Sequence, residues 1–360
     1  MGDWKGGVTC PSHAVGSVCD SQFPSRGHKA LRKSLRFYDE STAYRKAGVG
    51  GGYDCGMFSY RHAFHAGNHA DVFKHVALVA ILRHLTQKDT PLWVIDTHAG
   101  AGLYRLDGDY ADTSGEAAEG LFKLAQVAGT HHTIDGQPLA PAIADYLELV
   151  RGFNRGGQLR VYPGSPFLTQ RVLRTEVRDK LKLFELHPSD SKALAGHITQ
   201  LEAGRQVTME RADGFEALKA LLPPPSRRAL VLIDPSYEIK SDYGKVVAAL
   251  KDSLHRFATG TYAVWYPVIP RPEAHELPRK LKTLANQSRK PWLHATFAIG
   301  QDDTPVDPTQ PRRPGLLASG LFVINPPHTL KPALQAALPQ LLQAMGRGRG
   351  KGQVLETGGA

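Results

Sequence analysis

The chain has 360 residues, of which 41% are hydrophobic and 22% charged, so we expect a sizeable buried core and exclude a largely disordered protein. Lys and Arg exceed Asp and Glu by 44 − 34 = 10, which suits a polyanionic partner, nucleic acid before an anionic membrane, although charge alone does not decide this. Three cysteines, all within the first 55 residues, and the lack of a signal-peptide core or a run of about 18 apolar residues argue against a secreted or membrane protein and predict a cytoplasmic one.

The first 56 residues differ from the rest of the chain. They contain ten glycines and little apolar periodicity, and residues 48–52 are typical of a flexible linker. A strongly patterned segment begins abruptly at Met57. We therefore expect residues 1–56 to be a Gly-rich extension, either genuine or translated from sequence upstream of a true start at Met57, and we favour the second.

Apolar residues at helical spacing predict a helix over residues 68–85, with Asn68 or Asp71 as its N-cap. Helical patterns, such as those at 192–201 and 215–222, separate several of the short apolar runs that follow. These runs predict seven strands, at residues 92–96, 181–185, 206–210, 229–234, 261–268, 294–299 and 321–325. Strands that alternate with helices predict an α/β, Rossmann-like fold with a doubly wound, mainly parallel, seven-stranded sheet.

Two segments depart from that alternation. Residues 105–160 carry helical patterns at 121–127 and 143–153 and no clear strand, which predicts a helical insertion after the first strand. We expect the main domain to span residues 57–330, followed over 331–360 by a helix and a disordered basic tail, because residues 346–352 contain only Gly, Arg and Lys. The absence of coiled-coil heptads favours a monomer.

Three acidic motifs follow the first three predicted strands. The first, D-T-H-A-G-A-G, ends in Gly100 and Gly102, which let the backbone turn tightly and approach a ligand. Glu185 follows the second strand, where an acid commonly accepts two ribose hydroxyls, and Asp213 and Gly214 follow the third, where an acid can accept an adenine amine. Each acid alone is as typical of a helix cap or a loop. Together at one edge of the sheet, they predict an adenosine-containing cofactor.

The fourth strand ends in Asp234-Pro235-Ser236-Tyr237. The Asp234 carboxylate and the Pro235 carbonyl can accept hydrogen bonds from an exocyclic amine, and proline fixes the backbone beforehand. Tyr237 can stack on the ring that carries the amine, a contact worth roughly 1–3 kcal/mol. A simple turn with a capping Asp is the alternative for this tetrapeptide taken alone.

These motifs in this order resemble the class I S-adenosylmethionine-dependent methyltransferases that act on an amine nitrogen. Longer segments resemble the RlmJ family, bacterial enzymes that methylate adenine N6 in 23S ribosomal RNA, over a stretch from about residue 57 to about residue 327. These segments are residues 59–75, 96–102, 162–166, 185–190, 212–215, 227–238 and 257–268. The resemblance implies S-adenosylmethionine as cofactor, no metal, and 23S ribosomal RNA as partner, either naked or in an early assembly intermediate.

The resemblance also implies roles for individual residues. Ser236 is a departure, because the amino-methyltransferase motif usually has a second proline there, and its loss makes the turn less rigid. The implied cofactor-binding residues are His75, His98, Gly100, Gly102, Ser165, Glu185, Asp213, Gly214 and Asp234. The implied catalytic residues are Asp234, Pro235 and Tyr237, and the implied substrate-binding residues are Tyr60 and Tyr237.

Other classes of function remain open from the residues. A DNA adenine-N6 methyltransferase would use the same chemistry. A nicotinamide-dependent dehydrogenase would share the fold but would leave the D-P-x-Y turn unexplained, and a non-catalytic RNA-binding protein would not need Asp234. His62, His65 and His69 have helical spacing, but no cysteine pattern and no acid other than Asp71 accompanies them, so we favour packing or ligand contact over a metal site.

Overall fold

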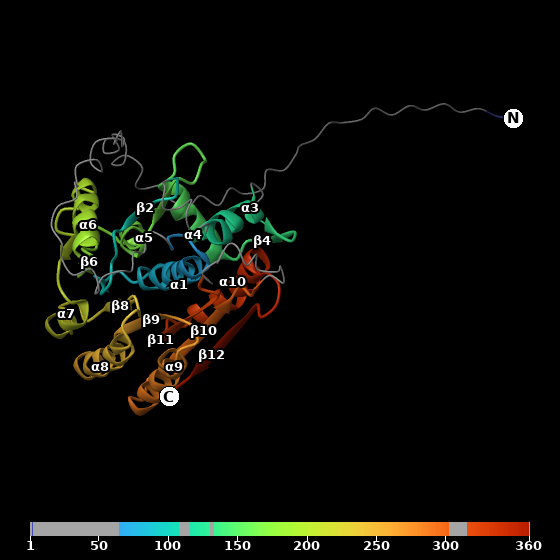
Figure 1. The fold of residues 1–360 in the computed structure, drawn as a ribbon. Helices are drawn as coiled ribbons and strands as arrows, with labels where there is room; N and C mark the ends of the chain where they lie inside the picture. The colour runs from blue at the N-terminus through green and yellow to red at the C-terminus, as the bar shows by residue number, and fades with distance from the viewer. Residues whose placement is uncertain (1, 3–64, 108–115, 130–132, 302–314, 360) are drawn as a thin grey trace, which may run out of the picture. The chain divides into compact units, whose positions relative to one another are not determined.

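The computed structural model describes residues 2, 65–107, 116–129, 133–301 and 315–359 (Figure 1). The described residues from 65 onward belong to one compact unit. Residues 3–56 of the predicted extension, Met57 and Tyr60 lie outside the described residues. The domain boundaries stay predictions.

An eight-stranded sheet in the order β12-β10-β11-β9-β8-β1-β6-β7 forms the centre of this unit. Neighbouring strands from β9 to β7 pair in parallel, whereas β11, β10 and β12 add antiparallel pairs. All seven predicted strands are present, so the mainly parallel α/β prediction is confirmed, but the sheet has one strand more. The strands are β1 (Trp93–Asp96), β6 (Lys180–Phe184), β7 (Val207–Glu210), β8 (Ala229–Ile233), β9 (Thr261–Pro267), β10 (Trp292–Ala298), β11 (Ala318–Ile324) and β12 (Gly352–Gly358).

Helices cover both faces of the sheet, because successive side chains of a buried strand point to opposite sides. In β8, Leu230 and Leu232 join the core on one face, and Val231 and Ile233 join the core on the other. The helices on the first face are α1 (His69–Leu85), α4 (Pro141–Gly152), α5 (Ser165–Val172), α6 (Pro188–Gln200) and α10 (Leu330–Met345). Those on the second face are α7 (Gly214–Leu221), α8 (Ser241–Arg256) and α9 (Pro272–Gln287) (Figure 1).

The segment between β1 and β6 is mainly helical, as predicted. It contains a short π-helix η3 (Ala118–Phe122), α3 (Lys123–Ala128), α4 and α5. Two small antiparallel pairs were not predicted: β2 (Leu103–Arg105) with β5 (Val161–Pro163), and β3 (Thr133–Ile134) with β4 (Gln137–Pro138). Each is only two or three residues long, too short to give a periodic signal in the sequence.

The C-terminal helix is present as α10, but the prediction of a disordered basic tail is wrong. Residues 352–358 form β12, which pairs antiparallel with β10, and Arg349 bridges Gln301 just before it. The ammonium of Lys282 on α9 lies 2.5 Å from the carboxylate of Glu356. The backbone N–H and C=O groups along the edge of β10 can pair with any other backbone, whatever its side chains. This pairing orders a segment whose composition alone indicates disorder.

The start of α1 is fixed by its cap. Asn68 is the N-cap, and its side-chain oxygen accepts a hydrogen bond of 2.9 Å from the backbone N–H of Asp71, so the first of the two predicted caps is the one used. Thirteen of the 17 residues of α1 are buried, because the helix packs between the sheet and the helical segment. No helix in the described ranges has the length and apolar character that a bilayer crossing requires.

Candidate active site

A pocket of about 400 Å³ lies where the carboxyl ends of the parallel strands meet, the usual ligand position in open α/β sheets. It brings together nearly all the residues selected from the sequence. Those that line it are His75, His98, Gly100, Ser165, Glu185, Asp213, Gly214, Asp234, Pro235 and Tyr237. Gly102 does not line it, and Tyr60 lies outside the described residues.

Glu185 and the glycine turn after β1 are held together by hydrogen bonds. The backbone N–H of Gly100 donates to Glu185 Oε2 at 2.8 Å, and that of His187 donates to Oε1 at 2.7 Å. Burial raises the pKa of Glu185 above its ordinary value. Each carboxylate oxygen keeps a lone pair for a further donor, so Glu185 can accept hydroxyl groups in the pocket.

Both glycines of the turn adopt left-handed conformations, with φ of +61° at Gly100 and +84° at Gly102. A Cβ at Gly102 would meet the side chains of Phe167 and Leu194 at 2.6 and 2.7 Å. Gly102 therefore permits close packing of α5 and α6 behind the turn, and its predicted role in cofactor binding stays a prediction. Only Gly100 of the pair faces the cavity.

Asp213 is the N-cap of α7 and also lines the pocket, so it has both of the roles considered from the sequence. Its Oδ1 accepts hydrogen bonds from the backbone N–H groups of Phe215 at 2.8 Å and Glu216 at 3.4 Å. Gly214 brings the start of this helix against the β1 turn, where a Cβ would come within 2.1 Å of the Thr97 carbonyl oxygen. The second carboxylate oxygen of Asp213 can accept a donor from a ligand.

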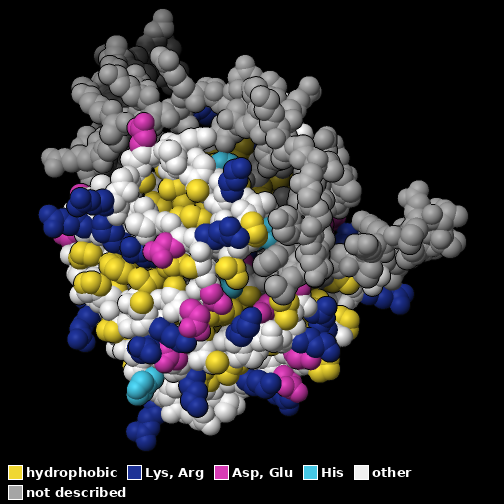
Figure 2. Space-filling model, turned by 60° about the vertical axis from the view of Figure 1, so that its left-hand side comes forward, with side chains coloured by type: hydrophobic (Ala, Val, Ile, Leu, Met, Phe, Trp, Pro, Cys, Tyr) yellow, Lys and Arg dark blue, Asp and Glu magenta, His cyan; other side chains and the backbone are white. Residues whose placement is uncertain are grey.

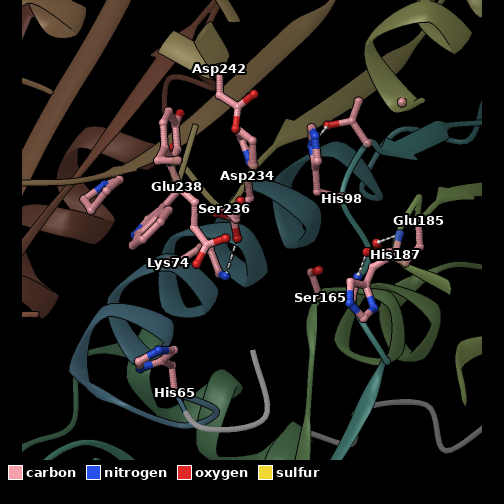
Figure 3. A pocket seen from close by; sticks show the side chains of 18 of the residues that line it. His65, Lys74, His98, Ser165, Glu185, His187, Asp234, Ser236, Glu238 and Asp242 are labelled. Carbon is pink, nitrogen blue, oxygen red and sulfur yellow. Dashed lines mark hydrogen bonds and ion pairs between the residues drawn. The ribbon is translucent and has the colours of Figure 1, made fainter. Parts of the chain in front are cut away.

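Ser165 and His98 line the pocket (Figure 3), and Asp96 lies buried behind Ser165. The Ser165 hydroxyl donates to Asp96 Oδ2 at 2.6 Å, and burial raises the pKa of Asp96 to about 6. Burial lowers the pKa of His98 to about 4, and its Nδ1 lies 2.8 Å from the Thr97 hydroxyl. His98 is therefore neutral near pH 7.

His75 also lines the pocket, from the second turn of α1. Its Nδ1 lies 2.6 Å from the hydroxyl of Tyr162, and the two rings are stacked with centroids 5.7 Å apart. The side chain is fully buried. This contact fixes the imidazole at the floor of the cavity.

Lys74 is the main site residue that the sequence analysis did not select. Its ammonium lies 2.5 Å from Asp234 Oδ2 and 3.0 Å from Asp71 Oδ1, and its side chain is only 5% exposed (Figure 3). Burial alone would lower the pKa of Lys74, but the carboxylates of Asp234 and Asp71 outweigh it and raise the pKa above its ordinary value. The signal in the sequence is a lysine within α1 three residues after Asp71, and this spacing gives no hint of a partner 160 residues away.

The turn after β8 presents Asp234 and Pro235 to the cavity, but the side chain of Tyr237 in the same turn is buried. The Tyr237 side chain is 1% exposed, because its ring packs 4.7 Å from the ring of Tyr243 and its hydroxyl donates to the Trp265 carbonyl at 2.7 Å. A planar ligand therefore meets little of this ring in the present arrangement. Trp265, which is less buried and also lines the pocket, is a second aromatic surface that the sequence analysis did not select.

The histidines considered as metal ligands do not lie around a common point in the described residues. His65 Nδ1 lies 2.9 Å from a carboxylate oxygen of Glu116, and the ring of His69 packs against Phe297. His62 lies outside the described residues. Over the described ranges, no group of three His, Cys, Asp or Glu side chains has a metal-binding arrangement.

Comparisons with known proteins identify the family of the chain. The family model described as "RsmJ: Ribosomal RNA large subunit methyltransferase D, RlmJ" matches residues 89–355. The ribosomal RNA large subunit methyltransferases J of Escherichia coli (strain K12) and Haemophilus influenzae are 44% and 41% identical, over 79% and 80% of this chain and 93% and 94% of theirs. A crystal structure of a Legionella pneumophila protein is 31% identical, with a TM-score of 0.68 over 82% of this chain and 98% of that one. The chain therefore belongs to the RlmJ family of ribosomal RNA large subunit methyltransferases.

Proposed function

We propose that this protein transfers the methyl group of S-adenosylmethionine to the N6 amine of one adenine in 23S ribosomal RNA. The observation that carries the proposal is that Asp234 and Pro235, which suit an exocyclic amine, line the same cavity as Gly100, Glu185 and Asp213, which suit an adenosine cofactor. Family membership supports the ribosomal RNA substrate.

The cofactor half of the cavity supplies polar groups for each part of S-adenosylmethionine. Glu185 would accept the ribose hydroxyls, and Asp213 would accept the adenine amine through the oxygen that the helix cap leaves over. Leu186 also lines the pocket and is 48% exposed, so it offers an apolar surface to the adenine ring. When bound, this cofactor supplies a methyl group already activated on a positively charged sulfur.

The substrate half orients the nucleophile. The Asp234 carboxylate and the Pro235 carbonyl would accept the two N–H groups of the target amine, which turns the nitrogen lone pair toward the methyl group. Lys74 holds the Asp234 carboxylate from behind through its short ion pair, so the acceptor is fixed before the base arrives. The methylated amine carries a proton that water can remove, so Asp234 acts mainly by orientation and desolvation.

The RNA itself would have to bring an unpaired or flipped adenine to this cavity. On the face drawn in Figure 2, Lys and Arg side chains are spread among acidic ones and do not gather in one basic patch. A distributed positive field of this kind attracts a polyanion without reading its sequence. The cavity, rather than the surrounding charge, would therefore select the base.

The test is methyl transfer from labelled S-adenosylmethionine to protein-free 23S ribosomal RNA and, in parallel, to duplex DNA. We expect the wild type to label the RNA and Asp234→Ala to lose roughly a hundredfold or more in kcat, because it removes the side-chain acceptor for the target amine. Asp252→Ala is the matched control, since that carboxylate lies away from the pocket, beside Arg256 on the same helix. Cofactor affinity, measured by calorimetry, should be unchanged in the Asp252 variant and weaker in the Asp234 variant, which loses one carboxylate from the pocket, so kcat is compared at saturating S-adenosylmethionine.

Two results would contradict the proposal. Labelling of DNA in preference to RNA would favour a DNA adenine methyltransferase. Equal values of kcat for Asp234→Ala and the wild type would exclude Asp234 from the reaction.

A further inference from the structure

Arg271 reaches the turn after β8 from a separate part of the fold. It is the N-cap residue of α9 and lines the pocket, and it lies outside every segment on which the family resemblance rests. Its Nη1 donates to the carbonyl oxygen of Tyr237 at 3.0 Å and to that of Glu238 at 3.3 Å. Hydrogen bonds from a charged donor are stronger than neutral ones, so this contact restrains the backbone directly after Asp234 and Pro235.

The turn needs an external restraint for two reasons. Tyr237 has a φ of +55°, a left-handed conformation that costs a bulky residue of order 1–3 kcal/mol. Ser236 occupies the place of the second proline in the usual motif, so the turn lacks one ring that would fix its backbone. The Tyr237 hydroxyl anchors one side of the turn to Trp265, and Arg271 anchors the backbone on the other side.

The side chain of Arg271 has no part in forming α9. The helix begins through backbone bonds, in which the N–H groups of Ala274 and His275 donate to the Arg271 carbonyl at 3.1 and 3.3 Å. The Arg271 N–H donates to the Ile269 carbonyl at 2.7 Å. A change of side chain leaves all three bonds possible, so variants at this position should fold.

We propose that Arg271 is a positioning residue, whose guanidinium clamps the turn after β8 and thereby aims Asp234 and the Pro235 carbonyl at the target amine. This inference rests on the proposed function for its catalytic consequence, but not for the clamp itself. A clamp acts on the rate of transfer from the bound complex, whereas an arginine that only attracts RNA phosphates would act on RNA affinity.

The experiment compares Arg271→Gln, Arg271→Lys and the wild type in the full chain. Hydrogen–deuterium exchange of residues 236–242, without RNA or cofactor, reports how readily the turn opens, because the Asp242 N–H donates to the Ile239 carbonyl at 3.0 Å. We expect exchange roughly tenfold faster in Arg271→Gln, because two charge-assisted bonds are lost. Arg271→Lys should be intermediate, because an ammonium keeps the charge but not the planar donor geometry. Arg279→Gln, an exposed position on the same helix, is the matched control and should exchange like the wild type.

Kinetics with 23S ribosomal RNA then test the consequence. We expect kcat of Arg271→Gln to fall roughly ten- to hundredfold, with KM for RNA and the Kd for S-adenosylmethionine unchanged. Unchanged exchange would overturn the clamp, and a change confined to KM would assign Arg271 to phosphate contact instead. If Arg271→Gln does not fold, Arg271→Lys gives the same comparison. If the wild type does not methylate RNA, the proposed function fails, and the exchange measurement still decides the clamp.

Discussion

Two buried carboxylates, Asp71 and Asp96, and the partly buried Asp234 lie around a single lysine, Lys74. The lysine pairs with Asp71 and Asp234 at 3.0 and 2.5 Å, whereas Asp96 has only hydrogen bonds from Ser165 and from the backbone N–H of His98. The Asp96 carboxylate is therefore buried without an ion pair of its own, and burial raises its pKa to about 6. A pocket with this excess of negative charge suits a cationic ligand such as a sulfonium or an ammonium group.

Asp96→Asn should stabilise the free protein, and the gain should grow with pH. The folded state binds a proton at Asp96 up to about pH 6, whereas the unfolded state loses it near 3.8, so the wild type loses stability between these values as pH rises. The variant does not titrate there, and its amide can still bond Ser165. Denaturant unfolding at pH 4, 5, 6 and 7 should show a difference that increases up to about pH 6 and then stays constant. A difference independent of pH would contradict this charge assignment.

At the scale of elements, the site depends on how closely α7 approaches the turn after β1. Gly214 begins α7, and a Cβ there would lie 2.1 Å from the carbonyl oxygen of Thr97, a backbone atom that cannot rotate away. The same helix start carries Asp213, whose carboxylate lines the pocket. Moving α7 outward would therefore move one acid away from the others.

Gly214→Ala should destabilise the protein by about 1–3 kcal/mol, because the methyl group overpacks this contact. It should also weaken binding of S-adenosylmethionine, since the helix carries Asp213. The matched control is Gly196→Ala in α6, where no atom lies within 4 Å of the added Cβ and the change should stabilise by about 0.5–1 kcal/mol. Thermal unfolding and calorimetry measure both effects. Gly214→Ala with the stability and affinity of the wild type would show that the approach is not required.

The elements that could be predicted from the sequence are those whose signal is local. The run Ala229–Ile233 is apolar throughout and ends in an acid, so both the strand and the place of Asp234 follow from the residues. β12 could not be predicted, because its order comes from pairing with β10 and from Glu356 meeting Lys282. Gly102 lies in the glycine motif after β1, but its close neighbours Phe167 and Leu194 come from distant helices. Its packing against them could therefore not be predicted from the motif.

The same distinction separates the site residues. Glu185 and Asp213 could be predicted because parallel strands bring their carboxyl ends to one edge of the sheet. Lys74, Trp265 and Arg271 could not, because each contacts the turn after β8 through packing between elements that no spacing in the sequence records.

At the scale of the whole molecule, a basic protein encloses an acidic cavity. The chain has a net charge of +10, while the carboxylates of Asp71, Asp96, Asp213 and Asp234 surround or line the pocket with Lys74 among them. The net positive charge of the protein favours a polyanionic partner, whereas the carboxylates at the pocket favour a cationic ligand. The proposed function requires this arrangement, because its RNA substrate is a polyanion and its cofactor is positively charged.

The identity of the methylated nucleoside tests the central claim most directly. Protein-free 23S ribosomal RNA would be incubated with the wild type and S-adenosylmethionine, digested to nucleosides and analysed by mass spectrometry beside a mock-treated sample. The account predicts N6-methyladenosine as the new product, because Asp234 and Pro235 present acceptors to an exocyclic amine. A new methyl group on a ribose hydroxyl, a ring carbon or a ring nitrogen would contradict it.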